Sequence, residues 1–398
     1  MIKHLIKLVW NRKRINFLIT VEIFVSFLVL FAVMMFVVYY ADNYRHPLGF
    51  TYDNVWNVSI DVKQQSDDYF TPEQLETTRQ LYLAVKDMPE IEQAASALSV
   101  PYEFGGSFGA EEFNGKTVEY ERDEVTDGFS EVLGLNIVAG RWFSKEDDGA
   151  NFQPVVINRR MAEEIFGAEE AVGKTLGAQG RNGRESRVVG VVSDFRKSGE
   201  LSAPGNFLFV RKNLNDPKDR PPRNLVLKLR PGTTAEFQVK LTDKLQAIAK
   251  DWSFEAQPLV EMRESAFRLQ LTPLILLGLI AGFLMIMVGL GLTGVLWQNV
   301  TQRTKEIGLR RAKGATASRI KKQILGELLI IASFGVLVGI AVVVQFPLLD
   351  IIGFITGKIY FYSIIVSALI VYLLTILCGL YPSWLATKVQ PAEALHYE

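Results

Sequence analysis

The sequence predicts a membrane protein with four transmembrane helices and one α+β domain inserted between the first and the second helix. Three observations support this fold class. Four apolar runs are long enough to cross a bilayer, at residues 17–40, 272–297, 323–346 and 361–381. Residues 41–268 instead alternate short apolar segments with turn residues. Basic residues gather at one set of ends of the apolar runs, which gives the protein a direction in the membrane.

The first apolar run, residues 17–40, contains a single charged residue, Glu22. It follows a basic leader, residues 1–16, so a cleaved signal peptide is the alternative. Signal-peptide cores span only about 7–15 residues and end in small residues before the cut. This run is longer and ends in Val-Val-Tyr-Tyr. We therefore expect an uncleaved anchor with Glu22 near its cytoplasmic end, a functional intramembrane carboxylate being the alternative for that residue.

The remaining runs are also predicted to be helices, because in lipid every backbone polar group must be satisfied within the segment. We expect the second run to begin at Thr272-Pro273 and the fourth to end before Pro382. Small residues recur at a four-residue spacing that lets helices approach closely. Packing within one subunit and a dimer interface are both open for these glycines, which are Gly278, Gly282, Gly335 and Gly339.

Orientation follows from charge. The loop at residues 298–322 has only one acid, Glu306, against eight basic residues, which are Arg303, Lys305, Arg310, Arg311, Lys313, Arg319, Lys321 and Lys322. Short loops this basic remain in the cytoplasm. We therefore expect both termini in the cytoplasm, including the tail at residues 382–398. The domain at 41–268 and the short link at 347–360 then lie on the opposite side.

The inserted domain is predicted to mix strands and helices. Strands are expected at 55–62, 154–158, 187–195 and 224–230. One helix is expected at 73–88, after Thr71-Pro72, and another at 234–251. A short helix is expected to follow the strand at 154–158 and to run through Phe166. The order shows no strict βαβ rhythm, which favours the α+β class. The length of the domain favours two lobes.

No residue is predicted to be catalytic, cofactor-binding or metal-ligating. Residues 168–175 (AEEAVGKT) fit a relaxed phosphate-loop pattern, but the first position is Ala168 and a helical segment precedes it. We therefore interpret Lys174 as part of a turn that leads into a strand. The three histidines lie far apart, and the single cysteine, Cys378, lies in an apolar run where it packs as a small hydrophobe. The zero net charge argues against nucleic-acid binding.

The segment at residues 301–315 (TQRTKEIGLRRAKGA) interleaves apolar and charged residues and ends at Lys313-Gly314, a helix stop. The simplest interpretation is an ordinary positive-inside loop. That interpretation explains the basic residues, but it does not explain a short ordered helix with an acid at its start. Such a helix could be held by a cytoplasmic partner protein.

These residues carry a resemblance to a known family. Residues 302–312 (QRTKEIGLRRA) with Gly314-Ala315, and residues 381–386 (YPSWLA) with 391–395 (PAEAL), are similar to the two signatures of MacB/FtsX-type permeases of ABC transporters. The inserted domain resembles theirs as well, in segments 129–143, 155–166, 172–176 and 188–195. The chain departs from the family at Lys313, where many relatives carry an apolar residue.

The resemblance implies four transmembrane helices and a two-lobed periplasmic domain in the bacterial inner membrane. It implies a separate cytoplasmic ATPase that binds ATP-Mg, no cofactor on this chain, and a second permease copy in a homo- or heterodimer. A periplasmic adaptor or hydrolase is a further expected partner. The residues expected to couple the permease to the ATPase are Arg303, Lys305, Glu306, Ile307, Gly308, Leu309, Arg310 and Arg311.

The function expected from this resemblance is mechanical coupling of ATP hydrolysis to movement of the periplasmic domain, for export of a peptide, drug or lipoprotein. One alternative is a regulator of a periplasmic cell-wall hydrolase that transports nothing. Another is a membrane sensor that works without an ATPase.

Overall fold

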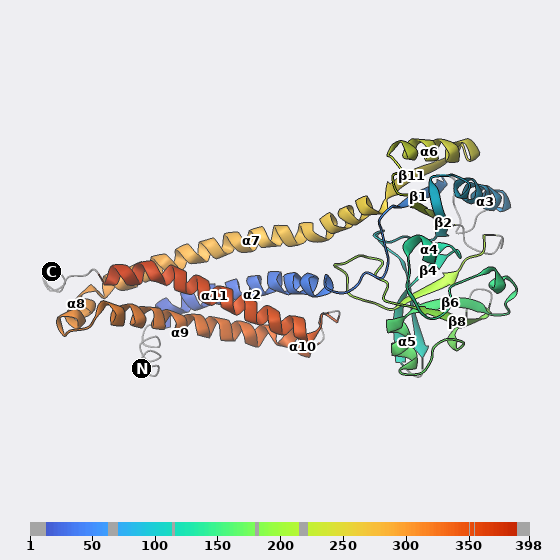
Figure 1. The fold of residues 1–398 in the computed structure, drawn as a ribbon. Coiled ribbons are helices and arrows are strands. Elements are labelled where there is room, and N and C mark those ends of the chain that lie inside the picture. The colour runs from blue at the N-terminus through green and yellow to red at the C-terminus, as the bar shows by residue number, and fades with distance from the viewer. Residues whose placement is uncertain are drawn as a thin grey trace. The chain divides into compact units, whose positions relative to one another are not determined.

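The structure is a computed structural model that describes residues 13–62, 71–113, 116–179, 183–214, 222–349, 351–353 and 355–387. The chain forms two compact units (Figure 1). Residues 43–270 make up one, here called the α+β domain, and residues 1–42 with 271–398 make up the other, here called the helical unit. The predicted fold class, four apolar helices with an α+β domain inserted after the first, is confirmed.

The first lobe of the α+β domain is an antiparallel sheet with two helices. Its elements are β1 (Val55–Val62), α3 (Pro72–Lys86), β2 (Ile91–Ala97), β10 (Asn224–Leu229), α6 (Glu236–Ile248) and β11 (Trp252–Pro258). The strand order is β11-β1-β10-β2, with every neighbouring pair antiparallel. Because one helix follows β1 and the other follows β10, this lobe is a ferredoxin-like β-α-β-β-α-β unit. Apolar residues of both helices, such as Leu81 and Leu241, share a core with the sheet.

Local sequence signals account for the start of α3. Thr71 is the N-cap, its hydroxyl accepts a hydrogen bond from the Gln74 amide, and the Gln74 side chain accepts one from the Thr71 amide. Pro72 occupies the first helical position, where its missing N–H has no cost. The predicted helix start and the predicted strand at residues 55–62 are both confirmed.

The second lobe is inserted between β2 and β10. Its elements are β3 (Ser107–Phe113), β4 (Lys116–Val125), α4 (Phe129–Leu133), β5 (Ile137–Gly140), the 3-10 helix η1 (Lys145–Gly149), β6 (Gln153–Asn158), α5 (Arg159–Phe166), β7 (Thr175–Gln179), β8 (Glu185–Val192) and β9 (Phe207–Arg211). The strands run in the order β4-β9-β6-β8-β5, with two parallel pairs, β4 with β9 and β6 with β8. Among the described residues, the strand pairing between this sheet and the first lobe is one residue pair, Ala97 with Val125.

A shared aromatic core makes the two lobes one unit. The rings of Phe195 and Phe207 lie 4.6 Å apart between centroids, and those of Trp142 and Phe209 lie 5.3 Å apart. Val226 of the first lobe packs in the same cluster. The predicted division into two lobes is seen in the strand pairing. The buried aromatic core nevertheless packs the two lobes together into one domain.

The helical unit contains α2 (Lys13–Asn43), the C-terminal part of α7 (Leu259–Gln302), α8 (Thr304–Ala312), α9 (Ala317–Val343), α10 (Gln345–Leu348) and α11 (Gly357–Ala386). Four helices are long and apolar enough to cross a membrane, at Phe17–Asn43, Leu259–Gln302, Ala317–Leu348 and Gly357–Ala386. Each contains the whole of one of the predicted spans. Helices α9 and α11 pack side by side (Figure 1).

Two predicted helix ends were wrong, and both were placed at prolines. Helix α7 begins at Leu259 and runs through Pro273, and α11 runs through Pro382 to Ala386. A proline removes one backbone donor and presses on the carbonyl four residues earlier. Buried residues lie on both sides of Pro382, with Gly379 before it and Ser383 and Ala386 after it, and this packing offsets the loss there. Ala266 is buried before Pro273.

The four glycines selected from the sequence divide into two pairs. A Cβ atom on Gly335 would lie 2.9 Å from the side chain of Ile23, and one on Gly339 would collide with the ring of Phe27. Both neighbours belong to α2, so these glycines let α2 and α9 of one subunit approach closely. A Cβ on Gly278 or Gly282 meets no atom within 4 Å in the described part of the chain.

We expect Gly339→Val to destabilise the chain, because the added side chain overlaps Phe27 in a packed helix contact. Overpacking of this kind costs about 1–3 kcal/mol. Thermal unfolding of the purified full chain in detergent should show a lower Tm. Gly294→Val is the matched control, since its Cβ meets no described atom within 4 Å. Equal Tm values for both variants would contradict the packing role.

One buried carboxyl group lies in β4, beside the junction of the two lobes. Asp123 is 2% exposed, and its carboxylate accepts hydrogen bonds from the Ser99 and Glu124 amides, at 3.1 and 2.8 Å, and from the Ser99 hydroxyl, at 3.1 Å. Burial outweighs these bonds and the nearby Lys197 ammonium group, and it raises the pKa of Asp123 to about 7. The folded domain therefore favours the protonated form of Asp123.

This raised pKa predicts that stability falls as pH increases. A carboxyl of the unfolded chain titrates near pH 4, so the stability from protonated Asp123 is complete below that value and is lost as pH rises through about 7. Between pH 5 and 8 this loss is on the order of 2 kcal/mol. Asp123→Asn, which mimics the protonated group, should flatten the pH dependence of unfolding of the full chain. A variant that keeps the wild-type pH slope would assign the dependence to other groups.

Candidate functional site

The candidate site is the basic segment around α8, between the end of α7 and the start of α9. Helix α8 ends in a Schellman motif, in which the amides of Gly314 and Ala315 donate to the carbonyls of Arg311 and Arg310. Gly314 has φ +92°, a conformation that strongly favours glycine. The Thr316 hydroxyl then caps α9 by accepting from the Arg319 amide. These local bonds explain why the segment forms a helix, a tight turn and a second helix.

The inner face of α8 is anchored by apolar packing. Ile307 is 5% exposed and packs with Val300, Ile320 and Ala386, which come from α7, α9 and α11. Gly308 is also buried and adds no side chain to this contact. The cluster fixes which face of α8 points inward.

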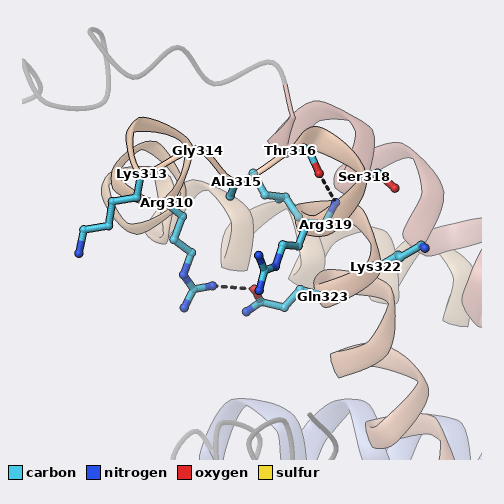
Figure 2. Close-up of a pocket in the computed structure, with 10 residues that line it drawn as sticks. Arg310, Lys313, Gly314, Ala315, Thr316, Ser318, Arg319, Lys322 and Gln323 are labelled. Carbon is cyan, nitrogen blue, oxygen red and sulfur yellow. Dashed lines mark hydrogen bonds between the residues drawn. The ribbon is translucent and has the colours of Figure 1, made fainter.

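Five polar side chains close a ring around this anchor, and we call the ring the clamp: Arg303, Glu306, Arg310, Gln323 and Glu327. Arg303 Nη1 lies 2.5 Å from a Glu327 oxygen, and Arg303 Nε lies 3.7 Å from a Glu306 oxygen. Arg310 donates to Glu306 at 2.6 Å and to Gln323 at 2.8 Å (Figure 2). Gln323 donates to Glu327 at 3.1 Å, which completes the ring.

The clamp is electrically balanced, with two guanidinium groups and two carboxylates. Its inner pair is poorly exposed, since the side chains of Arg303 and Glu327 are 11% and 15% exposed. Charges in such a position lose hydration and depend on their partners, so removing one partner leaves the other charge buried and unpaired. The clamp therefore joins α8 to the end of α7 and to the start of α9.

The structure distributes the eight predicted coupling residues over four environments. Ile307 and Gly308 face inward, and Arg303, Glu306 and Arg310 belong to the clamp. Arg311 donates to the carbonyl of Thr387 at 2.6 Å, at the end of α11. Lys305 and Leu309 remain exposed, Leu309 to 49%. Together with exposed Ala312 and Lys313 they make up the outer face of α8.

Sequence reasoning missed the α9 half of the clamp. Gln323 and Glu327 are four residues apart at the start of a predicted membrane helix, so they share one helix face. Polar residues at that spacing in an apolar run were the available signal. Their partners on α8 depend on the turn at Gly314, whose geometry the spacing does not show.

The second signature lies beside the site at the end of α11. Tyr381 stacks on Trp297 of α7, with ring centroids 6.3 Å apart, and lies 6.2 Å from the Trp384 ring. The part of the signature at residues 391–395 lies outside the described residues.

The rejected phosphate-loop pattern is a turn, as predicted. Gly173 has φ +85° and its amide donates to the Val188 carbonyl. Lys174 pairs with Glu169 and leads directly into the strand β7.

Two family models match the chain. The model described as the MacB-like periplasmic core domain matches residues 19–244, more than half of the 398-residue chain. The model described as the FtsX-like permease C-terminal matches residues 278–391. This range includes α8 and all five residues of the clamp.

Relatives agree with these matches. The chain is 26% identical to the ABC transporter permease YknZ of Bacillus subtilis over 69% of each chain, and 29% identical to the permease YvrN of Bacillus subtilis over 73% of this chain and 74% of YvrN. It is 27% identical to the macrolide export ATP-binding/permease protein MacB of Bdellovibrio bacteriovorus, over 69% of this chain but only 43% of that protein.

Among solved structures, the periplasmic region of MacB from Actinobacillus actinomycetemcomitans aligns over 54% of this chain and 92% of that one, with a TM-score of 0.39 and 17% identity. The assignment therefore depends on the sequence matches, which cover both the inserted domain and the helical unit. The chain belongs to the family of MacB/FtsX-type ABC transporter permeases.

Proposed function

We propose that this permease couples ATP hydrolysis by a separate cytoplasmic ATPase to movement of its α+β domain, with α8 as the contact. The observation that carries the proposal is the construction of α8. Its inner face is anchored by Ile307, its flank is held by the clamp, and its outer face presents a half-exposed leucine between lysines. An amphipathic helix held in this way suits insertion into a groove of a partner protein.

The relatives support an ATPase as that partner. YknZ and YvrN are described as ABC transporter permeases, and MacB as a protein that combines ATP binding with a permease. ATP-Mg would bind to the partner. We propose that α8 and both termini lie in the cytoplasm and the α+β domain on the outer side of a bacterial inner membrane, and the basic charge of the loop supports this orientation through the positive-inside rule.

Helix α7 supplies the path for motion. It is 44 residues long and ends one residue before α8 begins. Leu259 and Ala266 near its start are buried in the core of the α+β domain, and Arg263 pairs with Glu200 there at 2.6 Å. Val288 and Leu292 pack in the core of the helical unit. Movement of α8 would therefore act on a helix that both units hold.

The exported substrate would be a peptide, a drug or a lipoprotein. Macrolide export, the activity in the name of the MacB relatives, belongs to the drug class. A periplasmic adaptor would be a further partner. Among the described residues no feature favours the alternative of a cell-wall hydrolase regulator, so export is the function we propose.

The ATPase contact is tested by Leu309→Asp. A carboxylate on the outer face should disrupt an apolar contact with the ATPase, while the exposed position leaves the fold intact. We expect at least about a tenfold loss of ATPase that co-purifies with the full chain from its own membranes, measured by quantitative mass spectrometry. Leu83→Asp on α3 is the matched control, since Leu83 is exposed to 45%. Normal ATPase recovery with Leu309→Asp would overturn the proposed contact.

Glu306→Lys tests the clamp by the same measurement. It removes the partner of Arg303 and Arg310 and adds a third cation beside them. We expect loss of the ATPase complex, because α8 is no longer fixed against α9. Glu306→Gln still accepts a hydrogen bond from Arg310 and should retain more of the complex. An intact complex with Glu306→Lys would remove the clamp from the coupling mechanism.

The functional unit is proposed to be a dimer with a second permease copy, which could be identical or different. Helix α7 offers the surface, because Gly278 and Gly282 are open on it and its neighbours Leu279 and Phe283 are exposed to 66% and 62%. A pair of small residues four apart allows close packing of another helix in lipid.

If the chain forms homodimers, Gly278→Val should weaken them about tenfold or more through overpacking, as measured by light scattering in detergent. Gly294→Val is the control on the same helix, because position 294 lies 16 residues on, roughly 160° around α7. An unchanged dimer fraction with Gly278→Val, or equal losses with both variants, would exclude this face as the homodimer contact.

A further inference from the structure

A basic cavity lies beside α8, in the turn between α8 and α9. Its volume is about 670 Å³, and the residues lining it include Arg310, Lys313, Thr316, Arg319, Lys322 and Gln323 (Figure 2). Four of these side chains are cationic, and none of the residues that line the cavity is an acid.

Most of this positive charge is uncompensated. Arg310 is neutralised by Glu306 in the clamp. Lys313, Arg319 and Lys322 form no ion pair with any residue in the described ranges of the chain, and all three are exposed. In Figure 2 the guanidinium groups of Arg310 and Arg319 both point toward Gln323. Like charges held around one cavity favour a bound anion, which lowers their mutual repulsion.

The position of the cavity indicates what kind of anion it takes. Arg319, Lys322 and Gln323 lie in the first two turns of α9, and the apolar helix Ala317–Leu348 is one of the four candidate membrane spans. Basic residues at the end of a span lie at the level of lipid headgroups. Buried Ile320 adds an apolar wall to the same cavity.

The helix continues the same surface with apolar residues. Leu337 lies 18 residues after Arg319, which is five full turns and therefore the same face of α9. It is 61% exposed. Ile330, half-buried, lies on that face between them, about 16 Å beyond Arg319. A cation at one end with an apolar strip along the helix matches a phosphate headgroup with an acyl chain.

We propose that this cavity binds the phosphate of an anionic phospholipid, with Arg319 and Lys322 as its principal ligands and the acyl chain along α9. The site shares Lys313 with the outer face of α8, but its principal ligands lie on α9, and it does not depend on the proposed ATPase. Lipid bound there would lie beside Arg310 and Gln323, so the clamp would border an occupied headgroup site.

The test is a titration of detergent-solubilised full chain with short-chain phosphatidylglycerol, read as a shift in Tm. Phosphatidylcholine of the same chain length is the reference lipid. We expect a saturable stabilisation by phosphatidylglycerol alone. Arg319→Gln with Lys322→Gln should weaken its apparent affinity about tenfold or more. Lys305→Gln with Lys321→Gln is the matched control, because it removes two charges from the same segment without touching the lining of the cavity.

Control affinity equal to wild type, with loss only in the cavity variant, supports the site. Equal losses in the two double variants would mean general charge attraction and would overturn it. Stabilisation by inorganic phosphate at the same concentration would assign the cavity to a free anion. Loss of ATPase co-purification with unchanged lipid affinity in the cavity variant would assign it to the partner protein. Both double variants must unfold at the wild-type Tm without lipid, and single variants replace any that do not.

Discussion

The clamp is the interaction on which the arrangement around α8 depends. Apolar packing of Ile307 alone would hold a nine-residue helix at one point, and a helix this short is marginal without tertiary support. The clamp adds bonds on the flank, from Arg303 at the end of α7 to Glu327 on α9. Exposed ion pairs contribute little to stability, about 0–1 kcal/mol. The pair of Arg303 and Glu327 is mostly buried, so its contribution depends on the geometry of the contact. Removing one partner would leave the other charge without hydration.

A helix can transmit a displacement only if it is held at more than one place. Helix α9 meets this condition, because the clamp holds its first turns, while Gly335 and Gly339 lie against α2 further along. The close contacts leave no room for a gradual slide, since even a Cβ atom at position 339 would collide with the ring of Phe27. A packed contact of this type changes between discrete arrangements or not at all. The clamp and the glycine contact together make α9 a rigid element to which α8 is attached.

The sequence predicted the elements better than their partners. Apolar runs and caps identified the spans, strand β1 and the start of α3, because these features depend on neighbours within a few residues. The ferredoxin-like lobe was not foreseen, since β2 and β10 pair across a whole inserted lobe. Proline was taken as a helix end, but α7 continues through Pro273 and α11 through Pro382. The clamp was half visible, as Glu306 and Arg310 are one turn apart, while Glu327 is reached only through the turn at Gly314.

The clamp also changes the meaning of the basic loop. Eight basic residues against one acid suggest a uniformly positive surface at residues 298–322. Arg310 already bonds Glu306 and Gln323, and Arg303 is neutralised by Glu327 from outside the loop. An anion that drew Arg310 away would have to break both bonds, so an incoming phosphate meets Arg319, Lys313 and Lys322 first. The two neutralised arginines therefore hold α8 in place, and the positive charge that remains available in the cavity comes from Lys313 at the end of α8 and from Arg319 and Lys322 on α9.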